Sequence, residues 1–89
     1  MIRHIDLGDT PFKRSRQLKL LINNREVRFG GNTKLKIYGK LDCRSGRRMK
    51  AENRVFFASE AEAIENGYRP CGHCMREAYG EWKKENLSF

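Results

Sequence analysis

The segment Arg69-Pro70-Cys71-Gly72-His73-Cys74, called the knuckle below, decides how this chain folds. A Cys-x-x-Cys turn places two sulfurs close enough together to bind one ion. The remaining cysteine, Cys43, lies far upstream and follows an apolar run that ends at Leu41. Three soft ligands from two parts of a chain suit a tetrahedral zinc ion. The sequence therefore predicts a fold organised around Zn²⁺, with Cys43, Cys71 and Cys74 as ligands.

The fourth zinc ligand is left open by the sequence. His73 lies between the two knuckle cysteines and is the candidate that we include, although its ring would have to fold back over its own turn. Asp42 adjoins Cys43, but neighbours along a strand point to opposite faces. His4 from the N-terminal segment could also supply the ligand, and so could a water molecule. Within the knuckle, Gly72 suits a left-handed backbone.

Chain length and cysteine usage favour a metal as the element that stabilises the fold. The 89 residues predict one domain, residues 1–89, whose small core needs such support. Three cysteines cannot all pair, and we find neither a signal peptide nor an apolar stretch of the roughly 20 residues that span a membrane. We therefore expect a cytoplasmic protein with reduced thiols and bound zinc. Buried structural thiols or a redox pair would be different uses of the same cysteines.

The net charge of +8 is distributed unevenly along the chain. Residues 1–50 hold 14 Lys and Arg against 4 Asp and Glu, whereas residues 51–89 hold 5 against 7. Such asymmetry is typical of proteins that bind a polyanion, most often a nucleic acid. Simple solubility is the competing interpretation.

The element pattern predicts an α+β domain with a short two- or three-stranded antiparallel sheet and three helices around the metal knuckle. Residues 1–8 are expected to form a short strand or arm. Val27 and Phe29 suggest a strand before a turn at Gly30-Gly31-Asn32. Alternation of basic and apolar residues predicts a strand over 34–41, and a second apolar run predicts a strand over 53–58.

Helix signals are clear at three places. Thr10-Pro11 opens a basic helix that runs to about Asn24. Ser59 and Glu62 form a capping box for a short second helix, which Asn66-Gly67 closes. A final helix runs from residue 75 to about residue 86. Inward-facing side chains are predicted on the first helix (Phe12, Leu18, Leu21 and Ile22) and on the last (Tyr79 and Trp82).

The segment from Tyr38 to Met75 resembles the Ada-type zinc-binding domain, the N-terminal module of a bacterial DNA-repair and regulatory protein. The resemblance implies a four-thiolate zinc in a small α+β fold that contacts DNA, and it is strongest over residues 38–75. The matching features, in order, are Cys43, Glu52-Asn53, Val55-Phe56-Phe57, Ser59 with Glu62-Ala63, and Gly67-Tyr68-Arg69-Pro70-Cys71 with Cys74.

The resemblance also implies a methyl acceptor, and this chain departs from the family pattern around that position. In that family one zinc cysteine takes a methyl group from a DNA phosphotriester, and it stands four residues before the second family cysteine. If Cys43 is that second cysteine, the acceptor position falls on Gly39. If Cys43 is the acceptor, Arg47 stands at the second position. One family ligand is missing either way, so we expect no methyl transfer and no enzymatic activity, with stoichiometric methyl acceptance as the competing hypothesis.

A basic loop follows Cys43 and carries the predicted nucleic-acid contacts. Arginine side chains bind phosphate oxygens at two points, which gives affinity without reading sequence. We therefore expect a monomer that binds DNA, with RNA as a second possible polyanion and no membrane contact. A protein-interaction or structural domain, with Tyr79, Trp82 and Phe89 as its contact surface, is a third hypothesis. The predicted nucleic-acid contacts are Arg44, Arg47, Arg48, Lys50, Arg54 and Arg69.

Overall fold

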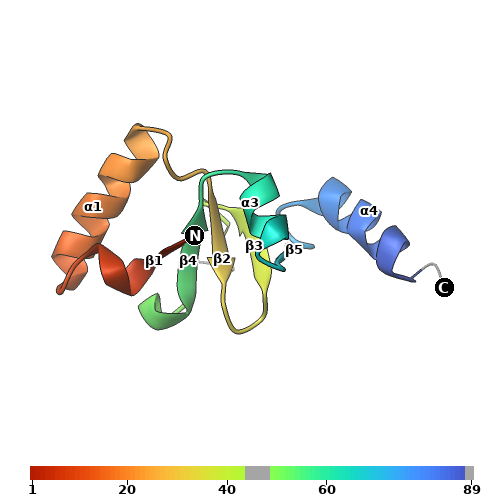
Figure 1. Ribbon diagram of the computed structural model, residues 1–89, viewed down its shortest axis with the longest axis horizontal. Helices are drawn as coiled ribbons and strands as arrows, with labels where there is room; N and C mark the ends of the chain where they lie inside the picture. Colours follow the sequence, from red (N-terminus) through yellow and green to blue (C-terminus); the bar gives the residue numbers. More distant parts are fainter. Residues whose placement is uncertain (44–48, 88–89) are drawn as a thin grey trace.

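Five short strands form one sheet in the order β1-β4-β2-β3-β5 (Figure 1). The structure is a computed structural model that describes residues 1–43 and 49–87. All neighbouring strands are antiparallel except β3 and β5, which are parallel. The strands are β1 (Ile2–Arg3), β2 (Phe29–Asn32), β3 (Ile37–Lys40), β4 (Arg54–Phe57) and β5 (Arg69–Pro70).

The sheet corrects the prediction of two or three antiparallel strands. Both edge strands have two residues each: β1 lies within residues 1–8, which we predicted as a short strand or arm, whereas β5 is too short for an alternating pattern to show in the sequence. Pro70 in β5 has no backbone N–H to donate, and this is tolerated because β5 lies at the edge of the sheet. The α+β class is confirmed, and the sheet is larger and mixed.

The glycine pair predicted as a turn lies inside β2 instead. Gly31 pairs with Tyr38 on one side and Val55 on the other. The turn follows β2, where the side-chain oxygen of Asn32 accepts hydrogen bonds from the backbone N–H groups of Lys34 (2.9 Å) and Leu35 (3.3 Å). The two glycines are therefore strand residues.

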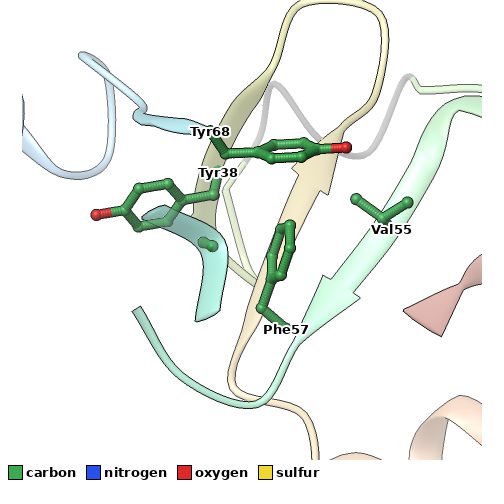
Figure 2. Close-up of a cluster of buried hydrophobic side chains, with 5 residues drawn as sticks. Tyr38, Val55, Phe57 and Tyr68 are labelled. Carbon is green, nitrogen blue, oxygen red and sulfur yellow. The ribbon is translucent and has the colours of Figure 1, made fainter. Parts of the chain in front are cut away.

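The core lies on one face of the sheet, under the short helix α3 (Glu60–Glu65). Figure 2 shows the rings of Tyr38, Phe57 and Tyr68 gathered with Val55. Ala63 of α3 completes this cluster and is fully buried. The Phe57 and Tyr68 rings meet edge to face with centroids 4.9 Å apart, a favoured aromatic geometry.

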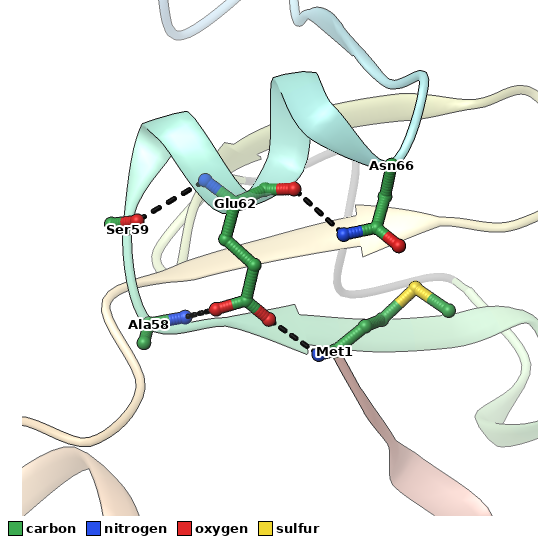
Figure 3. Close-up of polar contacts among 5 residues, drawn as sticks. All are labelled: Met1, Ala58, Ser59, Glu62 and Asn66. Atoms are coloured by element: carbon green, nitrogen blue, oxygen red, sulfur yellow. Dashed lines mark hydrogen bonds and ion pairs between the residues drawn. The ribbon is translucent and has the colours of Figure 1, made fainter.

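Helix α3 is capped largely as its sequence predicts. The Ser59 hydroxyl accepts a hydrogen bond from the Glu62 N–H at 3.1 Å, and Gly67 closes the end with a φ of 85°. The Glu62 carboxylate differs from a capping box, since it accepts from the Ala58 N–H at 3.1 Å and contacts the Met1 ammonium (Figure 3). That ammonium lowers the pKa of Glu62. Glu62 thereby ties the start of β1 to the end of β4.

The other two helices lie at opposite ends of the molecule (Figure 1): α1 (Pro11–Asn23) and α4 (Arg76–Leu87). Thr10 caps α1 through a hydrogen bond from the Lys13 N–H. None of the thirteen residues of α1 is fully buried, and Phe12 is 76% exposed. The inward orientation predicted for Phe12 and Ile22 is therefore wrong, because α1 packs beside the sheet rather than over it. No helix in the described part of the chain is long and apolar enough to cross a membrane.

The two β2 glycines give a matched test of the sheet packing. A Cβ at Gly31 would lie 2.9 Å from Phe57 Cε2 and 3.2 Å from the Ile37 carbonyl oxygen, whereas a Cβ at Gly30 meets nothing nearer than 3.8 Å. We expect Gly31→Ala to lower the free energy of unfolding by about 2 kcal/mol through overpacking. Gly30→Ala should change it by less than about 1 kcal/mol. Urea unfolding of the zinc-loaded proteins measures both, and equal losses would contradict this packing.

Candidate metal centre

Hydrogen bonds of the backbone place all three cysteines beside β3. Cys43 follows β3 in a tight turn, where its N–H donates to the Lys40 carbonyl at 3.1 Å. Cys71 follows β5, and its N–H donates to the Tyr38 carbonyl at 2.8 Å, which extends the parallel pairing. The knuckle then turns so that the Met75 N–H donates to the Cys71 carbonyl at 3.0 Å. Cys74 is thereby directed back towards β3.

The three sulfurs form one cluster. None of the three cysteines forms a disulfide, and their Sγ atoms lie within 4.8 Å of one another. Zinc–sulfur bonds of about 2.3 Å hold the sulfurs of one ion within about 4 Å of each other. The separation of the three sulfurs is close to this spacing, which fits their binding one zinc ion. The predicted convergence of Cys43 with Cys71 and Cys74 is confirmed.

Cys74 is the most strongly perturbed of the three thiols. Burial raises the pKa of Cys74 to about 11, and its proximity to Cys43 and Cys71 contributes to this increase. The Lys40 backbone N–H donates to Cys74 Sγ at 3.4 Å, which acts in the opposite direction because it favours the thiolate. Three thiolates this close together would repel one another, and a bound divalent cation would neutralise that repulsion.

Gly39 faces the sulfur cluster. A Cβ at Gly39 would lie 2.7 Å from Cys74 Sγ and 3.1 Å from Cys71 Cβ. A side chain at position 39 would therefore enter the sulfur cluster directly. This geometry favours the alignment in which Cys43 is the second family cysteine and Gly39 replaces the acceptor.

The remaining candidates for the fourth ligand lie outside the cluster. Within the described residues, the cluster contains no histidine and no carboxylate. His73 and Asp42 are both exposed. His4 instead lies against Phe56, with ring centroids 5.5 Å apart, where burial lowers its pKa. The assignment of His73 as a ligand stays a prediction.

The knuckle is also the anchor of α4. Gly72 does not adopt the left-handed backbone that we predicted; a Cβ there would lie 3.3 Å from the Tyr79 ring, so its lack of a side chain permits close packing. The Arg69 guanidinium lies 5.4 Å from the ring centres of both Tyr79 and Trp82. These cation–π contacts hold α4 against β5. Sequence reasoning placed Tyr79 and Trp82 in contact with the domain and missed Arg69 as their partner.

The predicted nucleic-acid contacts fall into three groups. Arg44, Arg47 and Arg48 lie outside the described residues. Lys50 is exposed, and Arg54 is half-buried in β4, where burial lowers its pKa. Arg69 is engaged with the α4 rings and with the Pro70 carbonyl, to which its Nη1 donates at 3.2 Å. A nucleic-acid role for these six residues stays a prediction.

The fold and the sulfur cluster define a small α+β metal-binding module. The family model described as the metal binding domain of Ada matches residues 23–77, which is more than half of the chain. The chain therefore belongs to the family of Ada-type metal-binding domains. The match confirms the resemblance over residues 38–75 and extends it across β2. Comparison with curated proteins and with solved structures finds no match. Family membership and the clustered thiols together identify zinc as the cofactor.

Substitution of the sulfurs tests the metal centre. We expect one zinc ion per chain, and a loss of zinc affinity of at least roughly 100-fold for Cys43→Ser, Cys71→Ser or Cys74→Ser, because thiolates are the ligands. His73→Ala is the control and should retain zinc, since His73 is exposed and outside the cluster. Competition with a chelating dye and native mass spectrometry provide the measurement. A comparable loss in His73→Ala would instead make His73 the fourth ligand.

Zinc affinity should rise with pH. Burial raises the pKa of Cys74 to about 11, so this thiol is protonated near neutrality and must release its proton when zinc binds. The logarithm of the apparent affinity should therefore increase from about pH 6 to about pH 8 with a slope of up to about three, because each thiol that binds zinc releases one proton. Proton release measured in weakly buffered solution checks the same number. An affinity independent of pH would exclude thiolate ligation.

Proposed function

We propose that this chain is a zinc-stabilised module that binds DNA through basic residues next to its metal centre and does not itself accept methyl groups. The observation that carries the proposal is the convergence of three thiols, within 4.8 Å, at the start of a strongly basic loop. Four of the seven residues from Arg44 to Lys50 are Lys or Arg. The metal would therefore fix the point from which this basic segment leaves the sheet.

Zinc has a clear structural task in this chain. In the described part of the chain, few apolar side chains are buried, and half of them lie on short strands. Strand β5 is only two residues long. Zinc bound to structural thiolate sites contributes about 10 kcal/mol or more at neutral pH, comparable to the whole stability of a small domain. Cys43, Cys71 and Cys74 would hold the ion, which would supply charge neutralisation and a cross-link between the two parts of the chain.

DNA is the partner that the charge distribution favours. Residues 1–50 hold 14 Lys and Arg against 4 Asp and Glu, and this half contains the loop that follows Cys43. Lys50 at the end of that loop is exposed, as is Lys40 at the end of β3. Contacts of this kind go to phosphates and give affinity without sequence reading. DNA binding of this kind requires only one such basic surface, which a monomer can provide.

Methyl acceptance is not part of the proposal because of Gly39. An acceptor must place a nucleophile on a side chain, and glycine at this position has none. A centre with three thiolates also carries less negative charge than one with four, and this lowers the reactivity of each sulfur.

Salt dependence tests the DNA proposal. If about five phosphates are engaged, log affinity against log salt should have a slope of about −4 to −5 on duplex DNA. Arg47→Ala combined with Arg48→Ala should weaken binding roughly ten-fold and reduce that slope by about 2. Lys83→Ala combined with Lys84→Ala is the charge-matched control, since both lysines are exposed on α4. Fluorescence anisotropy with a labelled duplex gives all values.

Three outcomes of that experiment would redirect the proposal. A flat salt response, or the same loss in the α4 control, would argue against a defined DNA surface. Tighter binding to a single-stranded RNA of equal length would make RNA the partner. Zinc content and circular dichroism of each variant establish that the fold is intact.

A protein-interaction domain is the second candidate function. The observation in its favour is the exposure of apolar side chains on α1, where Phe12 is 76% and Leu20 is 50% exposed. The surface that the sequence suggested is less suitable, because Tyr79 and Trp82 are half-buried against Arg69, and Phe89 lies outside the described residues. A complex that survives high salt would favour this candidate over DNA.

A further inference from the structure

A cavity of about 290 Å³ lies on the face of the sheet opposite the core. Gly30 and Gly39 pair directly across β2 and β3, and Phe56 pairs with Gly30 from β4. Because side chains alternate along a strand, these residues face away from the core cluster of Tyr38 and Phe57. The two adjacent glycines leave the floor of this cavity without side chains.

Two of the three cysteines line the same cavity. Cys43 and Cys71 line it together with Gly39, the residue whose Cβ would reach 2.7 Å from Cys74 Sγ. At Gly30, by contrast, a Cβ would meet nothing nearer than 3.8 Å, so the floor beside the cluster is open. The space directly above Gly39 is taken by the Cys74 sulfur, so an external ligand would reach the cluster from the part of the cavity that Cys43 and Cys71 line.

In the described residues, no fourth His, Cys, Asp or Glu side chain reaches this cluster. Within the described residues, only the three cysteines come together, and residues 44–48 contain no Cys, His, Asp or Glu. Zinc is almost always four-coordinate, and a site with three protein ligands keeps one position for an external group. The open fourth position presupposes the zinc centre of the proposed function.

We propose that this position takes a small organic thiol with an apolar body, bound to zinc as its thiolate. Sulfur is the ligand that a thiolate-rich zinc site accepts readily. The walls beyond the cysteines are mostly apolar, and Arg54 adds one cation that favours an anionic ligand. Binding would form one zinc–sulfur bond and would release the thiol proton to the solvent. Its body lies over the Gly30–Gly39 floor, and the apolar wall residues are Ile37, Leu41, Met49 and Phe56.

Cobalt substitution makes the external sulfur visible. Co²⁺ takes the place of zinc and absorbs through sulfur-to-cobalt charge transfer, with an intensity that grows with the number of bound thiolates. Titration with thiophenol should raise this absorption by roughly a third, since a fourth sulfur joins three, and should saturate at one thiol per metal. Thiophenol should bind at least roughly ten-fold more tightly than 2-mercaptoethanol, because its ring buries apolar surface in the cavity.

Two variants separate coordination from cavity binding. Gly39→Cys should show the four-sulfur spectrum without added thiol and should not respond to thiophenol; Cys74 Sγ, the end of a side chain, can move to admit it. Gly30→Val should narrow the cavity and weaken thiophenol binding roughly ten-fold, since less apolar ligand surface can be buried. It should leave Co²⁺ binding unchanged, and this variant does not depend on Gly39→Cys folding.

The outcomes distinguish this inference from the proposed function. If the protein binds Co²⁺ through three sulfurs and thiophenol leaves the spectrum unchanged, the thiol site is wrong while the metal centre stands. If no Co²⁺ binds, the metal centre and the thiol site both fail. An equal thiophenol response in Gly39→Cys and in the unaltered protein would also overturn the inference. DNA affinity is measured independently of all three results.

Discussion

The parallel pairing of β3 with β5 is the constraint on which the rest of the structure depends. Two hydrogen bonds of 2.8 Å, from Arg69 N–H to the Lys36 carbonyl and from Cys71 N–H to the Tyr38 carbonyl, align the knuckle with β3. Because Cys43 follows β3 in a tight turn, this alignment brings sulfurs from distant parts of the chain to one place. A two-residue strand is weak alone, and a metal that joins its end to β3 would stabilise it. Sheet formation and metal binding therefore support each other.

Local signals predicted much of this fold because they act over a few residues. The cap at Ser59, the left-handed Gly67 and the β4 strand follow from short-range chemistry. The predictions that failed concern contacts between distant segments. The Gly30-Gly31 pair resembles a turn unless Phe57 is known to lie beside it, and glycine in a strand pattern can equally mark close approach. The spacing of the cysteines predicted three ligands, whereas the fourth position depends on what the backbone at Gly39 faces, which only the tertiary structure shows.

The two faces of the sheet have different tasks. One face buries Tyr38, Val55 and Phe57 under α3 and provides the apolar core. The other carries the glycine floor and meets the thiols, where a bulky core residue would exclude any ligand. Arg69 connects the edge of this sheet to α4 through the rings of Tyr79 and Trp82. Because β5 contributes both to this contact and to the knuckle, the position of α4 is coupled to the metal centre.

The absence of a side chain at Gly39 also has an evolutionary consequence. Some glycine codons become cysteine codons through a single base change. One mutation at position 39 could therefore convert a zinc site that is open to external ligands into one with four protein ligands. Among the described residues, an added Cβ would come close to the end of the Cys74 side chain and to the Cys71 Cβ, so the Cys74 side chain would have to rotate. Related proteins with this fold could therefore have either a purely structural zinc site or a zinc site that binds small molecules, with the same arrangement of strands.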